Sequence, residues 1–81
     1  MQVLYFAWLR ERIGEPKEEV ETKAKTVAEL VEELRAREPR YQAAFADMAA
    51  VRVAVDQELV EMSASIEGAR EVAFFPPMTG G

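Results

Sequence analysis

The chain has 81 residues, enough for one small domain and too few for two. Hydrophobic residues make up 49% of it and charged residues 31%, a balance typical of a globular protein that folds unaided. The absence of Cys and His excludes disulfides, a thiolate nucleophile, an imidazole base and a cysteine-ligated metal site. We therefore expect no metal and no self-contained enzyme mechanism.

The charge balance narrows the class of partner. There are 15 acidic and 10 basic residues, giving a net charge of -5, so nucleic acid is not expected as a partner. An acidic surface instead suits docking onto a basic patch of another protein. No apolar run approaches the roughly 20 residues of a membrane span, and the N-terminus lacks the pattern of a signal peptide. We expect a cytoplasmic protein with no membrane partner.

The first predicted element is a central strand over residues 3–9, an apolar run rich in aromatic residues and followed by charged ones. Alternation along a strand makes both of its faces apolar. One face holds Val3, Tyr5, Ala7 and Leu9, and the other holds Leu4, Phe6 and Trp8. One face needs a core. The other is either buried within the fold as well or binds a partner, and the sequence leaves both readings open.

The next predicted elements are an edge strand and a helix. A turn at residues 14–16 precedes a polar strand over residues 18–22. Thr26 and Glu29 then have the spacing of a capping box, which predicts that a helix begins after Thr26. Pro39 ends this helix near residue 37 or 38. Its apolar stripe, at helical spacing, consists of Val27, Leu30, Val31 and Leu34.

The rest of the chain predicts a short helical segment and three further strands. Helical spacing recurs within residues 41–50 and indicates a second helix or an irregular helical turn. A hairpin follows, with strands at 51–55 and 59–60 joined by a polar turn at 56–58. Residues 61–68 form a connection to a last strand over 71–75, which two prolines end.

This order of elements predicts an α+β fold in which one main helix packs on one face of a mixed sheet, the β-grasp order. The domain is expected to span residues 1–75. Residues 76–81 are expected to form an extended, flexible tail ending in Gly-Gly. A Gly-Gly end can thread into a narrow active site because glycine has no side chain to clash.

The C-terminal carboxylate is the reactive group that remains once His and Cys are excluded. The residues from Pro76 to Gly81 reach roughly 20 Å at about 3.3 Å per residue, far enough to enter a buried pocket of a partner. A partner enzyme could convert the Gly81 carboxylate to a mixed anhydride with AMP, which a sulfur nucleophile or an amine can attack. The alternative is that the Gly-Gly end is frayed and has no role.

Three segments carry a family resemblance, at residues 3–11, 53–58 and 71–81. The last is the specific one, because it reads Ala-Phe-Phe-Pro-Pro, then two residues, then a terminal Gly-Gly. Together they resemble the small, sulfur-carrying subunit of molybdopterin synthase, a ubiquitin-like family. The resemblance covers the chain from end to end.

The resemblance implies a ubiquitin-like β-grasp fold and a carrier function. Gly81 would be adenylated by a relative of the ubiquitin-activating enzymes, which uses ATP, and then converted to a thiocarboxylate. A sulfurtransferase or desulfurase would supply the sulfur. The tail would insert into the large catalytic subunit and donate sulfur to cyclic pyranopterin monophosphate. The chain itself would bind no cofactor and would be the non-catalytic subunit of the complex.

Carried onto this sequence, the resemblance makes Gly81 the residue that bears the sulfur and Gly80 the residue that permits its passage. The other residues of the inserted tail would be Thr79, Met78, Pro77 and Pro76. We also expect an apolar partner interface on the outer face of the sheet. Its predicted members are Phe75, Phe6, Trp8 and Leu4.

Other functions stay open at this point. A sulfur carrier of the thiamine pathway shares the fold and the Gly-Gly end but usually lacks the Phe-Phe-Pro-Pro approach. A carrier for tRNA thiolation or amino-acid synthesis, or one that also forms protein conjugates, fits the same chemistry. A ubiquitin-like interaction module would use a sheet face and leave the terminus inert.

Overall fold

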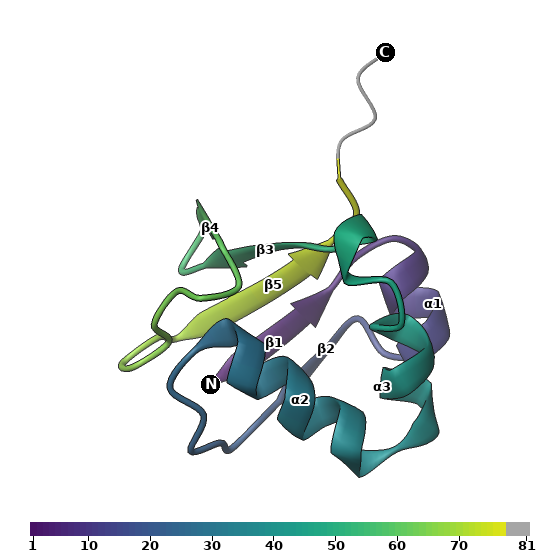
Figure 1. Cartoon of the computed structure of the whole chain (residues 1–81), viewed down its shortest axis with the longest axis horizontal. Helices are drawn as coiled ribbons and strands as arrows, with labels where there is room; N and C mark the ends of the chain where they lie inside the picture. Colours follow the sequence, from purple (N-terminus) through teal and green to yellow (C-terminus); the bar gives the residue numbers. More distant parts are fainter. Residues whose placement is uncertain (78–81) are drawn as a thin grey trace.

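The computed structural model describes residues 1–77, which form a five-stranded sheet packed against helices (Figure 1). The strands are β1 (Gln2–Tyr5), β2 (Lys17–Glu19), β3 (Arg52–Val55), β4 (Glu58–Val60) and β5 (Glu71–Phe75). The helical elements are α1 (Trp8–Ile13), α2 (Val27–Arg37), α3 (Pro39–Ala44) and the 3-10 turn η1 (Met48–Ala50). None of these helices is long and apolar enough to cross a membrane, among the residues described.

The sheet is mixed, in the order β2-β1-β5-β3-β4. Its centre is the parallel pair of β1 and β5, which come from opposite ends of the sequence. The other pairs, β1 with β2, β3 with β5 and β3 with β4, are antiparallel. This arrangement confirms the predicted α+β class with β-grasp order, including the central place of β1 and the edge position of β2.

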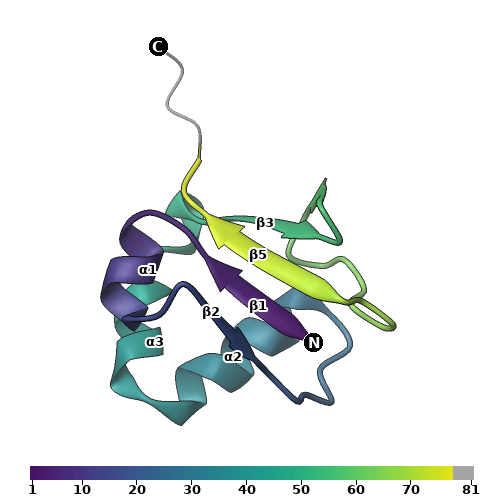
Figure 2. The ribbon, with the colours of Figure 1, turned by 180° about the vertical axis from the view of Figure 1, so that it is seen from behind.

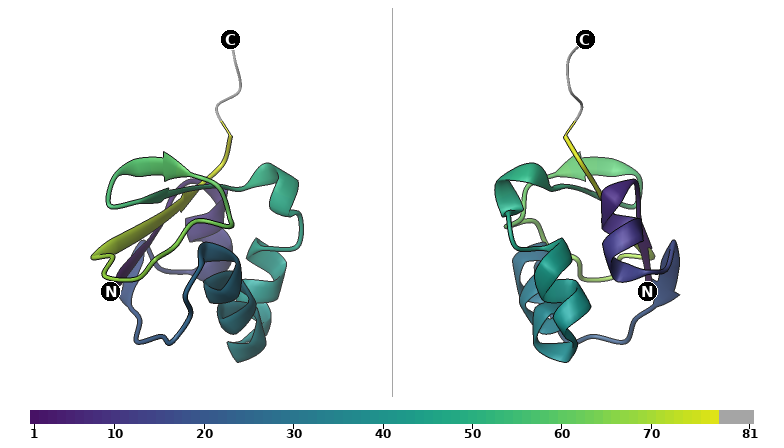
Figure 3. Two further views of the ribbon diagram at one scale, coloured as in Figure 1. Left: turned by 60° about the vertical axis from the view of Figure 1, so that its left-hand side comes forward. Right: turned by 90° about the vertical axis from the view of Figure 1, so that its right-hand side faces the viewer.

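The helices α2 and α3 lie on one face of this sheet, as the side views show (Figure 3). The opposite face, seen from behind, carries no helix among the described residues (Figure 2). The predicted main helix is α2, and α1 follows the end of β1. The sheet therefore has an inner face, toward α2 and α3, and an outer face that is open.

The start of α2 follows the predicted capping box. The backbone N–H of Glu29 donates to Thr26 Oγ1 at 3.2 Å. The first two backbone N–H groups of α2 donate to carbonyls of the connection between β4 and β5. Val27 N donates to Ala64 O at 3.1 Å, and Ala28 N donates to Met62 O at 2.8 Å. The helix N-terminus is thus satisfied within the fold and offers no free donors there.

The core lies between the inner face and the helices. The ring of Phe74 on β5 stacks at 6.3 Å from that of Tyr5 and meets Phe45 edge-on at 5.0 Å. All four apolar positions of the α2 stripe are buried, as their spacing predicts. The other fully buried side chains include Val3, Leu9, Ile13, Val20, Tyr41, Val51, Val53 and Val72.

The predicted strand over residues 3–9 is wrong beyond Tyr5. The chain turns at Ala7, whose φ of 55° and ψ of -132° are not those of a strand, and α1 begins at Trp8. An apolar run of this length does not distinguish strand from helix. Leu9 and Ile13, four residues apart, both enter the core from one side of α1, and this burial favours the helix.

Three smaller boundaries also differ. The edge strand covers Lys17–Glu19 rather than residues 18–22, and Val20 beyond it is buried. The hairpin turn is shorter than expected, because Glu58 already pairs with Val55 as the first residue of β4. The segment at 41–50 is helical in two pieces, α3 and η1, and Pro39 both ends α2 and begins α3.

Candidate functional site

One row of side chains runs across the outer face through every strand of the sheet. Leu4 on β1 pairs with Ala73 on β5, which pairs with Ala54 on β3. Ala54 in turn pairs with Leu59 on β4, and Lys17 on β2 pairs with Leu4 at the other edge. Apart from Lys17, the row is apolar, with two alanines at its centre.

Aromatic side chains border this row on one side. Phe75 lies two residues beyond Ala73 on β5, and the backbone N–H of Phe6 donates to the carbonyl of Phe74 at 3.0 Å, which holds Phe6 beside it. The large and small side chains together line a shallow, open hollow of about 610 Å³. It is lined by Leu4, Phe6, Ala54, Gln57, Glu71, Ala73 and Phe75. We call this surface the outer hollow.

The apolar residues of this region are unusually exposed. Phe6 is 49% exposed and Leu59 is 68% exposed, and they are the large hydrophobic side chains that the described part of the chain leaves in solvent. Ala73 is only 7% exposed and forms the floor. An exposed apolar hollow with a polar border is the usual form of a protein-binding surface.

Three of the predicted interface residues come together here. Leu4, Phe6 and Phe75 all line the outer hollow. The fourth, Trp8, lies on α1, where it is half-buried against the core and its ring is 4.6 Å from the Arg12 guanidinium carbon. The strand that was expected to place Trp8 on the same face ends before reaching it.

Sequence reasoning missed the alanines and Leu59. Ala73 falls on the same strand face as Phe75 by simple alternation, so the signal for it was present. Ala54 and Leu59 required the hairpin register, and the expected turn was one residue too long to give it.

The predicted tail begins at the border of the outer hollow. Pro76 and Pro77 follow Phe75 directly and are half-buried. They lead away from the end of β5 (Figure 1). The remaining predicted residues, Met78, Thr79, Gly80 and Gly81, lie outside the described residues.

A polar cluster on the helix side of the molecule has a structural role. The hydroxyls of Tyr5 and Tyr41 both donate to Glu18 Oε2, at 2.7 Å and 2.5 Å, and so join β1, β2 and α3. Burial, and then the hydrogen bond to Glu18, raises the pKa of Tyr41 to about 12 and also raises the pKa of Tyr5. Neither hydroxyl is therefore suited to act as a base near neutral pH.

Arg40 lies beside this cluster and is held by hydrogen bonds to neighbouring groups. Its Nη1 donates to the carbonyl of Ile13 at 2.7 Å and to Glu15 at 3.1 Å. The hydrogen bond to Glu38, at 2.5 Å, is the largest cause that raises the pKa of Arg40. These contacts occupy the guanidinium within the fold.

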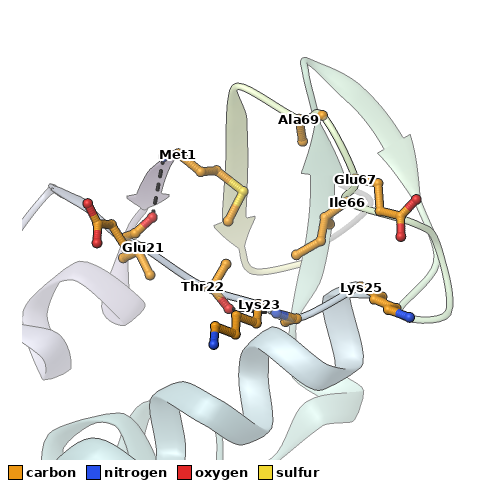
Figure 4. Close-up of a pocket in the computed structure, with 11 residues that line it drawn as sticks. Met1, Glu21, Thr22, Lys23, Lys25, Ile66, Glu67 and Ala69 are labelled. Carbon is orange, nitrogen blue, oxygen red and sulfur yellow. Dashed lines mark hydrogen bonds between the residues drawn. The ribbon is translucent and has the colours of Figure 1, made fainter.

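A second hollow, of about 500 Å³, lies between the segment before α2 and the loop before β5 (Figure 4). Met1 and Ile66 are among its lining residues. Lys23 and Lys25 point in opposite directions, so their ammonium groups do not converge on one ligand (Figure 4). Nowhere in residues 1–77 do three or more acidic side chains gather in a way that could hold a metal ion.

Comparison with known proteins gives matches over the whole chain. The model of the ThiS family matches residues 3–81. The chain is 38% identical to the molybdopterin synthase sulfur carrier subunit of Escherichia coli, covering 100% of this chain and 99% of that protein. It is 36% identical to the protein of the same name from Haemophilus influenzae, with the same coverage.

Solved structures agree with the fold. SAMP1 from Haloferax volcanii superposes with a TM-score of 0.77 at 23% identity, covering 100% of this chain and 98% of that one, and at this identity it shows the fold alone. A putative molybdopterin converting factor, subunit 1, from Pyrococcus furiosus gives a TM-score of 0.70 at 27% identity, covering 95% of each chain. These likenesses confirm the predicted ubiquitin-like β-grasp fold.

Proposed function

The chain belongs to the ThiS family, and we propose that it carries sulfur to molybdopterin synthase as a thiocarboxylate on Gly81. The observation that carries this proposal is its end-to-end likeness, at 38% and 36% identity, to proteins named as the sulfur carrier subunit of that enzyme. The chain is not an enzyme by itself. Its lack of Cys and His agrees with a protein whose chemistry resides in its partners and its own carboxylate.

Loading takes place in two steps. The Gly81 carboxylate attacks the α-phosphate of ATP on an activating enzyme related to the ubiquitin-activating enzymes, which releases pyrophosphate and leaves an acyl-adenylate. In the second step, a persulfide on a sulfurtransferase or desulfurase attacks the acyl carbon and AMP leaves. A thiol then cleaves the S–S bond of the resulting acyl disulfide, which oxidises the two thiols to a disulfide and frees the sulfur on Gly81. The product is a thiocarboxylate, which is ionised at neutral pH and is a good nucleophile without help from a base.

Delivery uses the outer hollow and the tail together. The outer hollow docks on the large catalytic subunit, and the tail enters the active site of that subunit. Pro76 and Pro77 restrict the tail where it leaves the body, which lowers the entropy lost on insertion. The thiocarboxylate then donates its sulfur to cyclic pyranopterin monophosphate. The product, molybdopterin, carries these sulfur atoms in a dithiolene group. Because a dithiolene contains two sulfur atoms, each molecule of product consumes two loaded chains.

The names of the curated relatives favour this pathway over the alternatives. A carrier for thiamine synthesis or tRNA thiolation would use the same loading steps and would differ only in the acceptor of the sulfur. An interaction module with an inert terminus would need the outer hollow but not Gly81. Activation consumes ATP, so the proposal includes a cytoplasmic location.

The intact mass of the chain tests the loading steps. The purified chain is incubated with ATP, a sulfur source and the activating enzyme of the same organism. We expect the mass change of one oxygen replaced by one sulfur. A variant with one residue appended after Gly81 should show no change, although its thermal transition should equal that of the parent. Loading of the extended variant, or no loading of the parent beside an active enzyme control, would contradict the proposal.

A further inference from the structure

Strained backbone positions border the outer hollow. Gln57, which lines the hollow, has a φ of 70°, and Ala7, which follows Phe6, has a φ of 55°. Positive φ is the ordinary place for glycine and is unfavourable for residues with a Cβ. Among the described residues, Gly14 at 93° and Gly68 at 74° follow this preference, whereas Ala7, Asp56 and Gln57 do not. A tight turn accounts for a positive φ, but not for a residue other than glycine at that position.

Of these residues, Gln57 places an amide side chain at the outer hollow. With Asp56, whose φ is 48°, it forms a two-residue loop between β3 and β4 in which both φ values are positive. Such a hairpin turn favours Asn or Asp at the first position and Gly at the second. Asp56 fits this preference, and Gln57 does not.

Asp56 fixes the turn against the sheet. Its Oδ1 accepts hydrogen bonds from the backbone N–H groups of Arg70 at 2.9 Å and of Glu71 at 3.0 Å. Its own N–H donates to the Glu71 carbonyl at 2.9 Å. This attachment to the start of β5 holds Gln57 at the polar border of the outer hollow.

The side-chain amide of Gln57 has no role within the described fold. Gln57 is exposed, and its amide makes no hydrogen bond to another group in residues 1–77. A glycine at this position would relieve the backbone and leave the turn intact. The turn requires the positive φ but not the side chain, and residues other than glycine held at positive φ cluster at binding sites.

We propose that Gln57 is a recognition residue, whose amide hydrogen-bonds an amide group of the large catalytic subunit beside the docked outer hollow. An amide both donates and accepts, so another amide, from a backbone or a side chain, matches it in a single contact. Polar contacts of this kind surround the apolar centre of protein interfaces and fix the orientation of the partner. The inference rests on the proposed function, because it takes the outer hollow as the docking surface.

Gln57→Gly should change stability and binding in opposite directions. The midpoint of thermal unfolding should rise by a few degrees, because glycine accepts the positive φ. The dissociation constant for the purified large subunit of the same organism, measured by isothermal titration calorimetry, should increase about three- to tenfold, as for the loss of one interfacial hydrogen bond. If Gln57 had only a structural role, the substitution would change the midpoint of thermal unfolding and leave the dissociation constant unchanged.

Two control variants separate the amide from the backbone. Gln57→Ala removes the amide but keeps a Cβ at positive φ, so it should weaken binding to a similar extent without the gain in stability. Gln42→Ala removes an exposed amide from α3, which donates to the Arg35 carbonyl at 3.3 Å, and should leave the dissociation constant unchanged.

The failure of this inference differs from failure of the proposed function. Unchanged binding by Gln57→Gly and Gln57→Ala, together with weaker binding by Phe75→Ala, would overturn the role of Gln57 and leave the docking surface in place. Unchanged binding by all three variants would overturn the docking surface as well.

Discussion

Phe74 and Phe75 are neighbours in β5, but their side chains lie on opposite faces of the sheet. Phe74 is fully buried between Tyr5 and Phe45, whereas Phe75 is half-buried and lines the outer hollow. The period of two along a strand allows one segment to supply a core and a binding surface at once. The inner face stabilises the fold, whereas the outer face, which we propose as the docking surface, is not needed for the core.

The two faces also differ in how their side chains fit together. The inner face presents large side chains that interlock with α2 and α3, such as Tyr5 and Phe74. The outer face has Ala54 and Ala73 at its centre, so it forms a hollow. A chain of this size has too few residues to cover both faces of its sheet.

The largest effect is expected at the inner face. Phe74→Ala should lower the free energy of unfolding by about 3–5 kcal/mol, because it removes a fully buried ring and leaves a cavity. This is a large share of the stability of a small domain, which is about 5–15 kcal/mol. Urea denaturation followed by circular dichroism measures it. A loss below about 1 kcal/mol would contradict the assignment of this face to the core.

The adjacent substitution should act on binding. Phe75→Ala is expected to lower stability by no more than about 1 kcal/mol, because the ring is only half-buried. It should weaken binding to the large catalytic subunit by about 2 kcal/mol, or roughly thirtyfold, as expected for an aromatic residue at the centre of an interface. Calorimetric titration gives the binding change and thermal unfolding the stability. A variant that melts as Phe74→Ala does, yet binds normally when folded, would remove the distinction between the faces.

Alkaline pH should lower the free energy of unfolding through Tyr41, on the helix side of the molecule. Tyrosine in an unfolded chain titrates near about pH 10, whereas burial and Glu18 raise the pKa of Tyr41 to about 12 in the fold. Between these values the unfolded state has lost a proton that the folded state keeps, so stability falls as pH rises. Tyr41→Phe should cost about 1–2 kcal/mol at pH 7 and make this fall shallower. Denaturation series at pH 7 to 11 test it, and an equal slope in both proteins would contradict the assignment.

The smallest expected effect is a gain in stability. Ala7→Gly should stabilise the protein by up to about 1 kcal/mol, because glycine accepts the φ of 55° and this outweighs its greater entropy when unfolded. In a domain of this size, 1 kcal/mol raises the melting temperature by about 4–8 °C. Binding to the large subunit should not change, since only a methyl group is lost. A lower melting temperature would show that the methyl group of Ala7 contributes packing that exceeds the strain.

The sequence was informative where a local pattern had one structural solution. The Thr26 and Glu29 capping box and the apolar stripe of α2 predicted that helix over its full length. The strand before Pro76 was predicted equally well, because two prolines end it without ambiguity. The order of the elements predicted the β-grasp fold, and the resemblance, carried mainly by the last segment, supplied the proposed function that these elements alone left open.

The errors arose where local patterns were ambiguous. Residues 3–9 are apolar throughout, so no periodicity indicated that the strand ends and α1 begins at Trp8. A polar turn of three residues and one of two look alike in sequence, although they give different registers to β4. The outer hollow depends on that register, which brings Leu59 opposite Ala54. Its small residues could be recognised only once the sheet was assembled.

The most direct test of the carrier role follows the sulfur after loading. The thiocarboxylated chain is mixed with the large catalytic subunit and cyclic pyranopterin monophosphate, and both the intact mass of the chain and the pterin products are followed over time. We predict that the chain returns to the mass of its carboxylate form while a dithiolene appears, with two chains consumed for each product. A chain that binds the large subunit but keeps its sulfur, with no dithiolene formed, would contradict the account.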